Sequence, residues 1–290
     1  MSGSIKLNNS FPVFIPEELK GLSSCGSRAE LDEKVQSLFG GINEDIFGKI
    51  IAQCDDAKTL LTLAYCVNKK FPGLVSKVVS NFSLGEVVRF CGPKFRMISL
   101  DATPLFNFKE APLDKLKLIA SCHEMNRHVE GNEGLSYIRM EAGTTLNQVF
   151  EIAKDAKINI HIWIDVWDRV MRAFGDRPVE QTYGVLVTHN VFKGSRSKSY
   201  NDQKELVEKL KCEFPRLLEA VVLCIFTRRD FELCLYEPNL WRPETTYTRC
   251  FECIDTGPLG VGSCVPSRIF VRCGDYIESQ DIGVGGRRES

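Results

Sequence analysis

The sequence lacks any apolar run near the roughly 20 residues that a membrane-spanning helix needs, so we expect no membrane segment. Its charges nearly cancel, because 37 Lys and Arg face 38 Asp and Glu, for a formal net charge of −1. The excess of positive charge that attracts nucleic-acid phosphates is therefore missing. The start, MSGSIKLNNSFPVF, has no apolar core segment, so we do not expect a secretory signal peptide, although it is compatible with an uncleaved type III export signal.

Common catalytic motifs are missing as well. The sequence has no serine nucleophile elbow, no P-loop and no glycine fingerprint of a dinucleotide site. Its four histidines are His123, His128, His161 and His189. His123 and His128 are five residues apart, which does not match the i,i+4 spacing of two ligands on one helical face. Asp165 and Asp168 follow His161, but we expect Asp165 to cap a helix rather than to act as an acid or base.

Cysteine, in contrast, is frequent, and we expect every thiol to be reduced. The twelve cysteines are Cys25, Cys54, Cys66, Cys91, Cys122, Cys212, Cys224, Cys234, Cys250, Cys253, Cys264 and Cys273. Several lie within apolar stripes, where a free cysteine behaves as a small hydrophobic residue. Disulfide frameworks are typical of small secreted domains, and 290 residues are enough for a packed core. These features predict a reducing compartment, the cytosol of the producing cell or of a host cell.

One cysteine group leaves a metal site open as an alternative. Cys250 and Cys253 form the sole C-x-x-C, and Cys264 and Cys273 could complete four zinc ligands. However, the second pair is not C-x-x-C, and Cys250 and Cys253 would point to opposite faces of a strand. We therefore expect no metal and no cofactor. The glycines of the intervening GPLGVGS are expected to form a turn.

The most informative stretch is residues 42–71, INEDIFGKIIAQCDDAKTLLTLAYCVNKKF. Apolar residues from Ile42 to Cys54 recur every three or four positions, which predicts an amphipathic helix. Asp55 and Asp56 interrupt the pattern and can accept hydrogen bonds from the N–H groups that open the next helix. A second apolar stripe starts at Leu60 and ends before Pro72 and Gly73, which favour a helix stop.

This stretch resembles an F-box. Ile46 and Ile50 match its spaced aliphatic residues, Leu60 and Leu61 match its leucine-rich helix, and the ending runs from Val67 to Phe71. The sequence departs from the family in having Ile42-Asn43 for Leu-Pro, Asn68 for the usual cysteine and Phe71 for tryptophan. The resemblance implies binding to a Skp1-type adaptor protein of a cullin ubiquitin ligase. The partner-binding residues that it implies are Ile42, Ile46, Ile50, Leu60, Leu61, Val67 and Phe71.

The pattern predicts an α+β fold in three parts: a flexible tail over 1–27, a helical F-box-like unit over 28–90 and an α+β region over 91–290 with short, mainly antiparallel strands. Ser27 is expected to cap the first helix. In the last part, INIHIWI, YTRCFECI and RIFVRC predict strands, and 200–210 and 217–226 predict helices. The segment 92–112 is irregular and contains Pro93, Pro104 and Pro112. The short basic loop KGSRSKS, residues 193–199, is expected to be solvated.

The α+β region is also similar to a module of unassigned biochemistry found with F-box-like segments in proteins of chlamydia-like intracellular bacteria. The residues that carry this similarity are PVEQTYGVLVTHNVFKGSRSKSYNDQKELV, WRPETTYTRCFE and IGVGGRR. It implies a host-directed protein but no catalytic residue. We expect a non-enzymatic adaptor that links the ligase to an unknown protein target. The alternative hypotheses are an enzyme that pairs Cys250 or Cys253 with His189 or His161, and a structural zinc module.

Overall fold

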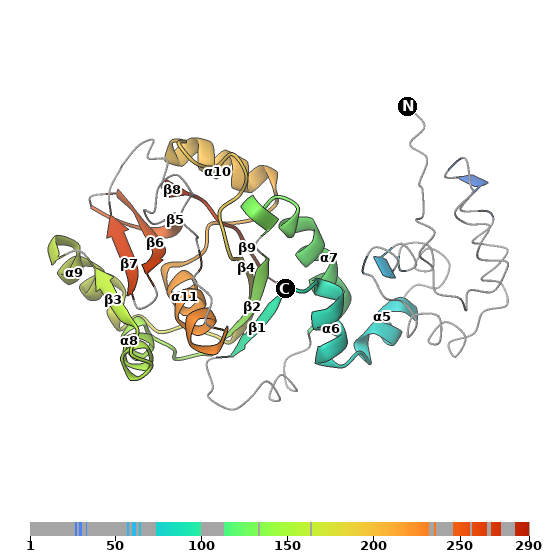
Figure 1. Ribbon diagram of the computed structural model, residues 1–290, viewed down its shortest axis with the longest axis horizontal. Helices are drawn as coiled ribbons and strands as arrows, with labels where there is room; N and C mark the ends of the chain where they lie inside the picture. Colours follow the sequence, from blue (N-terminus) through green and yellow to red (C-terminus); the bar gives the residue numbers. More distant parts are fainter. Residues whose placement is uncertain are drawn as a thin grey trace. The chain divides into compact units, whose positions relative to one another are not determined.

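The computed structural model describes residues 74–99, 113–132, 134–162, 164–231, 246–255, 257–265, 268–273 and 282–289, with Ser27, Ala29, Glu30, Glu33, Ala57, Leu60, Leu61, Ala64 and Leu235 (Figure 1). Contacts divide the chain into two units. The first takes the described residues up to Gly92 and Leu113–His123, and the second takes those from Pro93 to Ser99 and from Glu124 onward. No helix among the described residues is long and apolar enough to cross a membrane.

The first unit is helical, with α5 (Leu74–Ser80), α6 (Leu84–Cys91) and the start of α7 (Lys115–Asn126). Ser83 and Glu86 form a capping box at the start of α6. The Lys115 ammonium donates to the carbonyl oxygens of Ser80 and Phe82, and the Phe82 and Phe90 rings stack at 5.4 Å. The predicted cap at Ser27 is present, because its hydroxyl accepts from the Glu30 N–H at 3.2 Å. The first unit therefore combines capped helices with aromatic packing.

The second unit contains two sheets, so the predicted α+β class is confirmed. The first sheet has the order β1 (Arg96–Ser99), β2 (Leu135–Met140), β4 (Tyr183–Thr188), β9 (Arg287–Glu289). The second has the order β3 (Asn159–Ile162), β7 (Arg268–Cys273), β6 (Gly257–Val265), β5 (Tyr247–Ile254), β8 (Ile282–Gly283). Antiparallel pairings predominate, and β1–β2, β3–β7 and β5–β8 are parallel.

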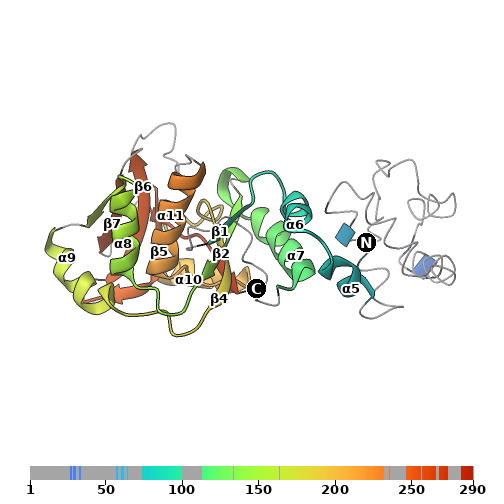
Figure 2. The ribbon, with the colours of Figure 1, turned by 90° about the horizontal axis from the view of Figure 1, so that it is seen from below.

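Helices surround and separate these sheets. They are the short η3 (Glu130–Asn132), α8 (Leu146–Asp155), α9 (Ile164–Val170), the π-helical turn η4 (Met171–Gly175), α10 (Tyr200–Lys209) and α11 (Leu217–Phe231). Helix α11 contacts strands of both sheets and lies between them (Figures 1 and 2). Every residue from Ala220 to Thr227 is buried, which is typical of a helix packed on all sides. Helix α11 is therefore the centre of the core.

The segment Ile282–Glu289 joins the two sheets, because its β8 end pairs with β5 and its β9 end pairs with β4. Three consecutive backbone N–H groups in it donate to buried hydroxyls. Those of Val284, Gly285 and Gly286 donate to Ser195 at 3.1 Å, Thr248 at 2.8 Å and Thr188 at 3.0 Å. We call this set the hydroxyl cluster. It satisfies backbone donors that a buried connection would otherwise leave unpaired.

Close packing explains why the same segment contains glycine. A Cβ on Gly286 would lie 2.2 Å from Cζ of Phe192, and one on Gly283 would lie 2.7 Å from Cβ of Val191. Both distances are far too short for any larger residue. The glycines therefore allow the backbone to lie against buried side chains.

Some local predictions are wrong. The segment GPLGVGS is not a turn but part of β6, the middle strand of an antiparallel meander with β5 and β7. Asp165, the predicted cap, lies within α9, because that helix begins at Ile164.

The basic loop is also less solvated than predicted. Ser195 is fully buried, and the Arg196 guanidinium lies 2.7 Å from the Glu130 carboxylate. Only Lys193, Gly194, Ser197 and Lys198 are exposed. In the irregular region after Gly92, Arg96–Ser99 form strand β1 in parallel pairing with β2, so this part is integral to the second unit.

Candidate functional site

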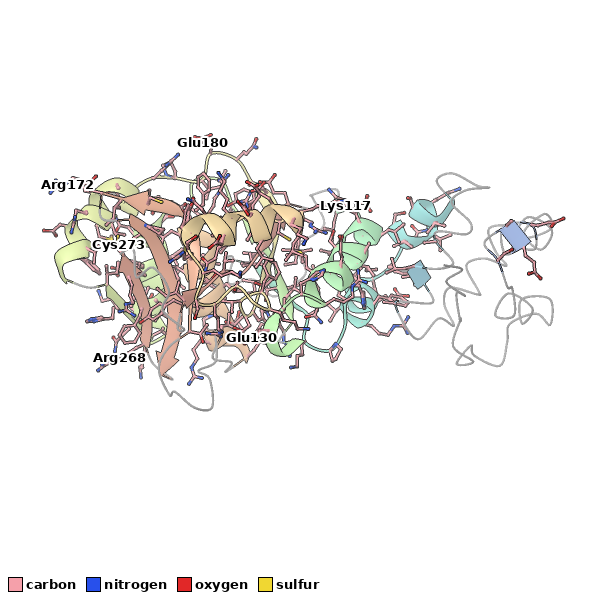
Figure 3. All side chains as sticks on the ribbon, turned by 90° about the horizontal axis from the view of Figure 1, so that it is seen from above. Lys117, Glu130, Arg172, Glu180, Arg268 and Cys273 are labelled. Atoms are coloured by element: carbon pink, nitrogen blue, oxygen red, sulfur yellow. The ribbon has the colours of Figure 1, made fainter. Side chains whose placement is uncertain are left out.

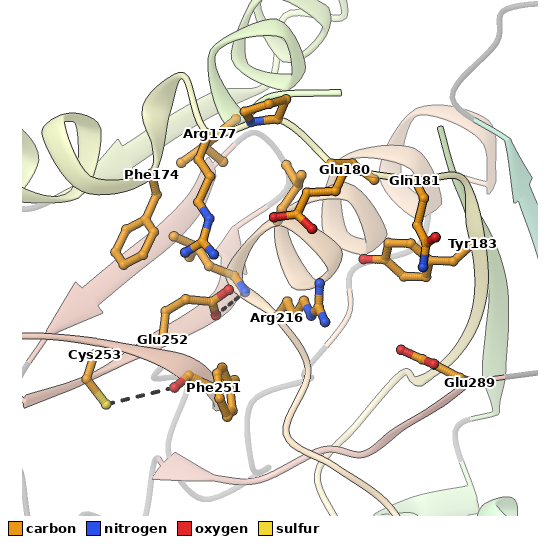
Figure 4. A pocket seen from close by; sticks show the side chains of 15 residues that line it. Phe174, Arg177, Glu180, Gln181, Tyr183, Arg216, Phe251, Glu252, Cys253 and Glu289 are labelled. Atoms are coloured by element: carbon orange, nitrogen blue, oxygen red, sulfur yellow. Dashed lines mark hydrogen bonds between the residues drawn. The ribbon is translucent and has the colours of Figure 1, made fainter. Parts of the chain in front are cut away.

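A pocket of about 530 Å³ opens on the second unit where the loop before β4, the start of α11 and strand β5 meet (Figure 4). Such a volume lies within the range of small-molecule and side-chain binding sites. Its lining residues are Leu146, Phe174, Arg177, Pro178, Val179, Glu180, Gln181, Tyr183, Arg216, Leu217, Leu218, Phe251, Glu252, Cys253 and Glu289. We call it the α11 pocket.

The loop side of the α11 pocket is held by the start of α8. Thr144 accepts a backbone hydrogen bond from the Val179 N–H at 2.9 Å, and Gly143 donates to the Val179 carbonyl at 2.8 Å. The Asn147 amide donates to the Asp176 carboxylate at 2.7 Å, which ties α8 to the end of the π-helical turn. These bonds position the loop that carries Arg177 and Glu180.

The helix side is fixed by two carboxylates at the start of α11. The Glu252 carboxylate accepts from the Leu217 N–H at 2.6 Å, and the Glu219 carboxylate accepts from the Arg216 N–H at 2.8 Å. A negative charge here is stabilised by the free N–H groups and by the helix dipole. Burial nevertheless raises the pKa of Glu252, and the nearby charge of Glu219 adds to the increase.

A buried charged network lies beneath this end of the helix. Glu219, fully buried, accepts from the Tyr183 hydroxyl at 2.8 Å and from the Arg287 guanidinium at 2.7 Å. Arg287, 2% exposed, also pairs with Glu213 at 2.8 Å and with Glu289 at 2.6 Å. We call Tyr183, Glu213, Glu219, Arg287 and Glu289 the charged cluster. Burial, followed by the charge of Glu219, raises the pKa of Tyr183, so its hydroxyl remains a donor.

Four charged side chains of the α11 pocket have no ion-pair partner among the described residues: Arg177, Glu180, Arg216 and Glu252. Of these, the Glu252 carboxylate is occupied by its hydrogen bond from the Leu217 N–H. In Figure 4 both guanidinium groups and the Glu180 carboxylate point into the pocket. The Arg216 guanidinium also lies 5.6 Å from the centre of the Tyr183 ring. The pocket can therefore offer charge to a ligand, which the charged cluster cannot.

The predicted partner-binding residues fall mostly outside the described residues. Ile42, Ile46, Ile50, Val67 and Phe71 lie outside them. Leu60 is fully buried within the chain, and Leu61 is half-buried. Of these two leucines, Leu61 thus offers the accessible surface.

The predicted thiol–imidazole pairs are not supported by the geometry. Cys250 is fully buried, and burial raises its pKa well above the usual range of a thiol, which disfavours the nucleophilic thiolate. His161 stands on β3, three strand positions from β5, which corresponds to roughly 14 Å at about 4.8 Å per strand. The buried ring of His189 is hydrogen-bonded to the Ser136 hydroxyl at 2.7 Å.

The zinc alternative finds no support in the described residues either. Cys250 is buried, whereas Cys253 is exposed, as expected for opposite faces of a strand. No group of three or more Cys, His, Asp and Glu side chains in the described part of the chain could hold a metal ion.

Sequence reasoning missed the α11 pocket, whose charged residues come from segments far apart in the chain. One local signal was present, because Glu219 lies at the third position of the predicted helix, where a carboxylate caps free N–H groups. Comparison with protein-family models, with curated proteins and with solved structures finds no match for the chain.

Proposed function

We propose that the chain is a protein-binding adaptor. The segment 42–71 binds a Skp1-type protein, and the α+β unit binds a second protein, which is thereby brought to a cullin ubiquitin ligase. The observation that carries the proposal is the F-box-like order of residues, with spaced isoleucines, an acidic turn, Leu60-Leu61 and the ending from Val67 to Phe71. The adaptor would act only by bringing the ligase and the target protein close together, so no catalytic residue is required.

Three observations on the described residues support the proposal. Leu61 keeps part of its side chain accessible, as a contact residue must. The α+β part forms a compact unit with its own buried core, so it can present a separate binding surface. The seven cysteines with described side chains are free thiols, as a protein acting in a reducing host cytosol requires.

Co-purification with a recombinant Skp1-type protein tests the proposal. The unmodified chain should bind, and Leu61→Asp should abolish binding, because it places a charge in an apolar contact worth at least about 2 kcal/mol. Ser76→Asp is the matched control, since it adds the same charge at an exposed position of α5. Circular dichroism must show that both variants keep their helices.

Two results would contradict the proposal. One is failure of the unmodified chain to bind the Skp1-type protein at micromolar concentration. The other is unchanged binding by a folded Leu61→Asp variant. If Leu61→Asp unfolds the chain, the milder Leu61→Ala variant must reduce binding at least fivefold in its place, while Ser76→Ala does not.

A further inference from the structure

We propose that the α11 pocket is the site that recruits the target, and that it binds a short peptide segment in which acidic side chains flank a large apolar one. This inference rests on the proposed adaptor function, and it specifies the chemistry of the second partner. Three properties of the pocket carry it: its apolar walls, its unpaired cations and the composition of its rim.

The walls provide room and surface for one large apolar side chain. Phe174 and Leu146 line the pocket from the α8 side, and Phe251 lines it from β5. Phe251 is 66% exposed, although a phenylalanine in the middle of a strand is normally buried. Among the described residues only Trp167 is another large hydrophobic residue with such exposure, at 39%. Contact with a ligand's apolar group would remove this surface from water.

The unpaired cations provide recognition of an acidic side chain. Both Arg177 and Arg216 point into the pocket, and neither lies within ion-pairing distance of a carboxylate among the described residues. A guanidinium binds a carboxylate through two parallel hydrogen bonds, so each arginine can hold one acidic side chain in a defined orientation.

Two of the carboxylates around the pocket already have partners within the chain. Glu252 accepts from Leu217 at the start of α11, and Glu289 is paired with Arg287 at 2.6 Å. The first N–H groups of α11 are therefore occupied by the chain's own carboxylates, and the anion-binding capacity of the pocket comes from the arginines. Glu180 is the exception, because its carboxylate faces the pocket unpaired and repels an incoming anion.

The rim favours a peptide over a free small acid. Arg, Tyr and Phe are enriched in protein–protein contact sites, and these types contribute Arg177, Arg216, Tyr183, Phe174 and Phe251 to the lining. Gln181 is also exposed beside Glu180 and can hydrogen-bond to peptide groups. Figure 3 shows Glu180 at the surface of the unit, where a bound chain could pass over it.

Titration of the full chain, labelled with nitrogen-15 in its arginine side chains, tests the proposal. The probe is the capped pentapeptide acetyl-Gly-Asp-Phe-Asp-Gly-amide, followed by NMR. The Nε resonances of Arg177 and Arg216 should shift in a saturable way. The matched peptides with Asn or Lys in place of both Asp should bind at least fivefold more weakly, because they cannot form charge-assisted pairs.

Some variants of the pocket should weaken binding of the peptide, and one should strengthen it. Arg216→Gln and Arg177→Gln should each weaken the Asp peptide about tenfold, the size of one lost charge-assisted pair, and leave the Asn peptide unchanged. Glu180→Gln should strengthen the Asp peptide, because it removes the opposing charge. Arg172→Gln is the control, since Arg172 is exposed but does not line the pocket (Figure 3).

Equal affinity for the Asp, Asn and Lys peptides overturns the proposal, as does Asp-peptide binding that Arg216→Gln and Arg177→Gln leave unchanged. Binding of phenylacetate as tightly as the Asp peptide overturns the assignment to a peptide segment. The titration uses no Skp1-type protein. A chain that binds the peptide but not the Skp1-type protein therefore refutes the adaptor function alone, and the reverse result refutes the pocket assignment alone.

Discussion

The α+β unit buries polar groups in two regions that are stabilised in different ways. In the charged cluster, Glu219 and Arg287 are almost completely buried and hold each other as ions. In the hydroxyl cluster, the side chains of Ser195, Thr248 and Thr188 are neutral and accept one backbone N–H each. Both regions stabilise the same segment, Ile282–Glu289, so the unit offers an internal comparison of buried charge with buried neutral hydrogen bonds.

The difference lies in what happens when one partner is removed. A buried ion without its counter-ion keeps its full desolvation cost, so the loss is large even if the intact pair contributes little. A neutral donor without its acceptor loses much less. The charged cluster should therefore act mainly through the penalty for disrupting it, and the hydroxyl cluster through many small contributions.

Removing the buried cation should have the largest effect. Arg287→Met leaves the carboxylate of Glu219 buried with only Tyr183 and the Arg216 N–H as donors. We expect the free energy of unfolding to fall by about 3–5 kcal/mol, as measured by urea denaturation. In the double variant Glu219→Gln/Arg287→Met the uncompensated charge is gone, so most of the loss should be recovered. A double variant as unstable as Arg287→Met would show that packing, not charge, dominates.

Overpacking the segment that joins the two sheets should have the second-largest effect on the free energy of unfolding. Gly286→Ala places a Cβ 2.2 Å from the buried Phe192 ring and should lower the free energy of unfolding by about 1–3 kcal/mol. Gly85→Ala is the opposite case, because that helical glycine has only the Ser83 hydroxyl oxygen within 4 Å, at 3.9 Å. It should stabilise the first unit by about 0.5–1 kcal/mol. Thermal unfolding of both variants gives the signs, and equal signs would contradict the packing argument.

Deleting one hydroxyl should cost less. Thr248→Val keeps the side-chain volume but leaves the Gly285 N–H without its acceptor. We expect a loss of about 1–2 kcal/mol in the free energy of unfolding. Thr248→Ser keeps the acceptor and should retain most of the stability. If Thr248→Val were as damaging as Arg287→Met in the same urea experiment, the contrast between the two clusters would be refuted.

The smallest effect should be the pH dependence that Glu252 gives to the free energy of unfolding. Its pKa is raised in the folded protein, chiefly by burial, so the folded state binds the proton more tightly than the unfolded state. Its contribution to stability is therefore complete below the ordinary carboxyl pKa of about 4.3 and is lost as the pH rises through the higher folded value. Glu252→Gln should abolish this part of the pH dependence. Urea midpoints of both proteins from pH 4 to pH 8 measure the difference.

The sequence was informative where a side-chain pattern is local. The predicted strands YTRCFECI and RIFVRC match β5 and β7 to the residue, and Ser27 was recognised as a helix cap. Prediction from the sequence failed where an element depends on residues that are far away in the chain. Gly257–Val265 lacks the side chains that mark a strand and forms β6 because β5 and β7 flank it.

The α11 pocket was unpredictable for the same reason. Arg177 and Arg216 are separated by 39 positions in the sequence, and only the loop fixed to Thr144 and the start of α11 bring them to one cavity. Neither arginine belongs to a motif, and each alone is an ordinary surface charge. The F-box-like pattern, by contrast, lies within one continuous stretch, so it could be proposed from the residues alone, and it stays a prediction.

The position of Ile282–Glu289 in the sequence sets the order in which the α+β unit can fold. This segment follows every other strand of the described residues and supplies one strand to each sheet. Its hydrogen bonds reach back 98 residues to Thr188 and 68 residues to Glu219. Until it has been synthesised, Glu219 lacks its cation and the Thr188 hydroxyl lacks its donor from Gly286. Contacts of such long sequence separation form slowly, so a nascent chain must wait, partly assembled, for these eight residues to leave the ribosome before both sheets can close.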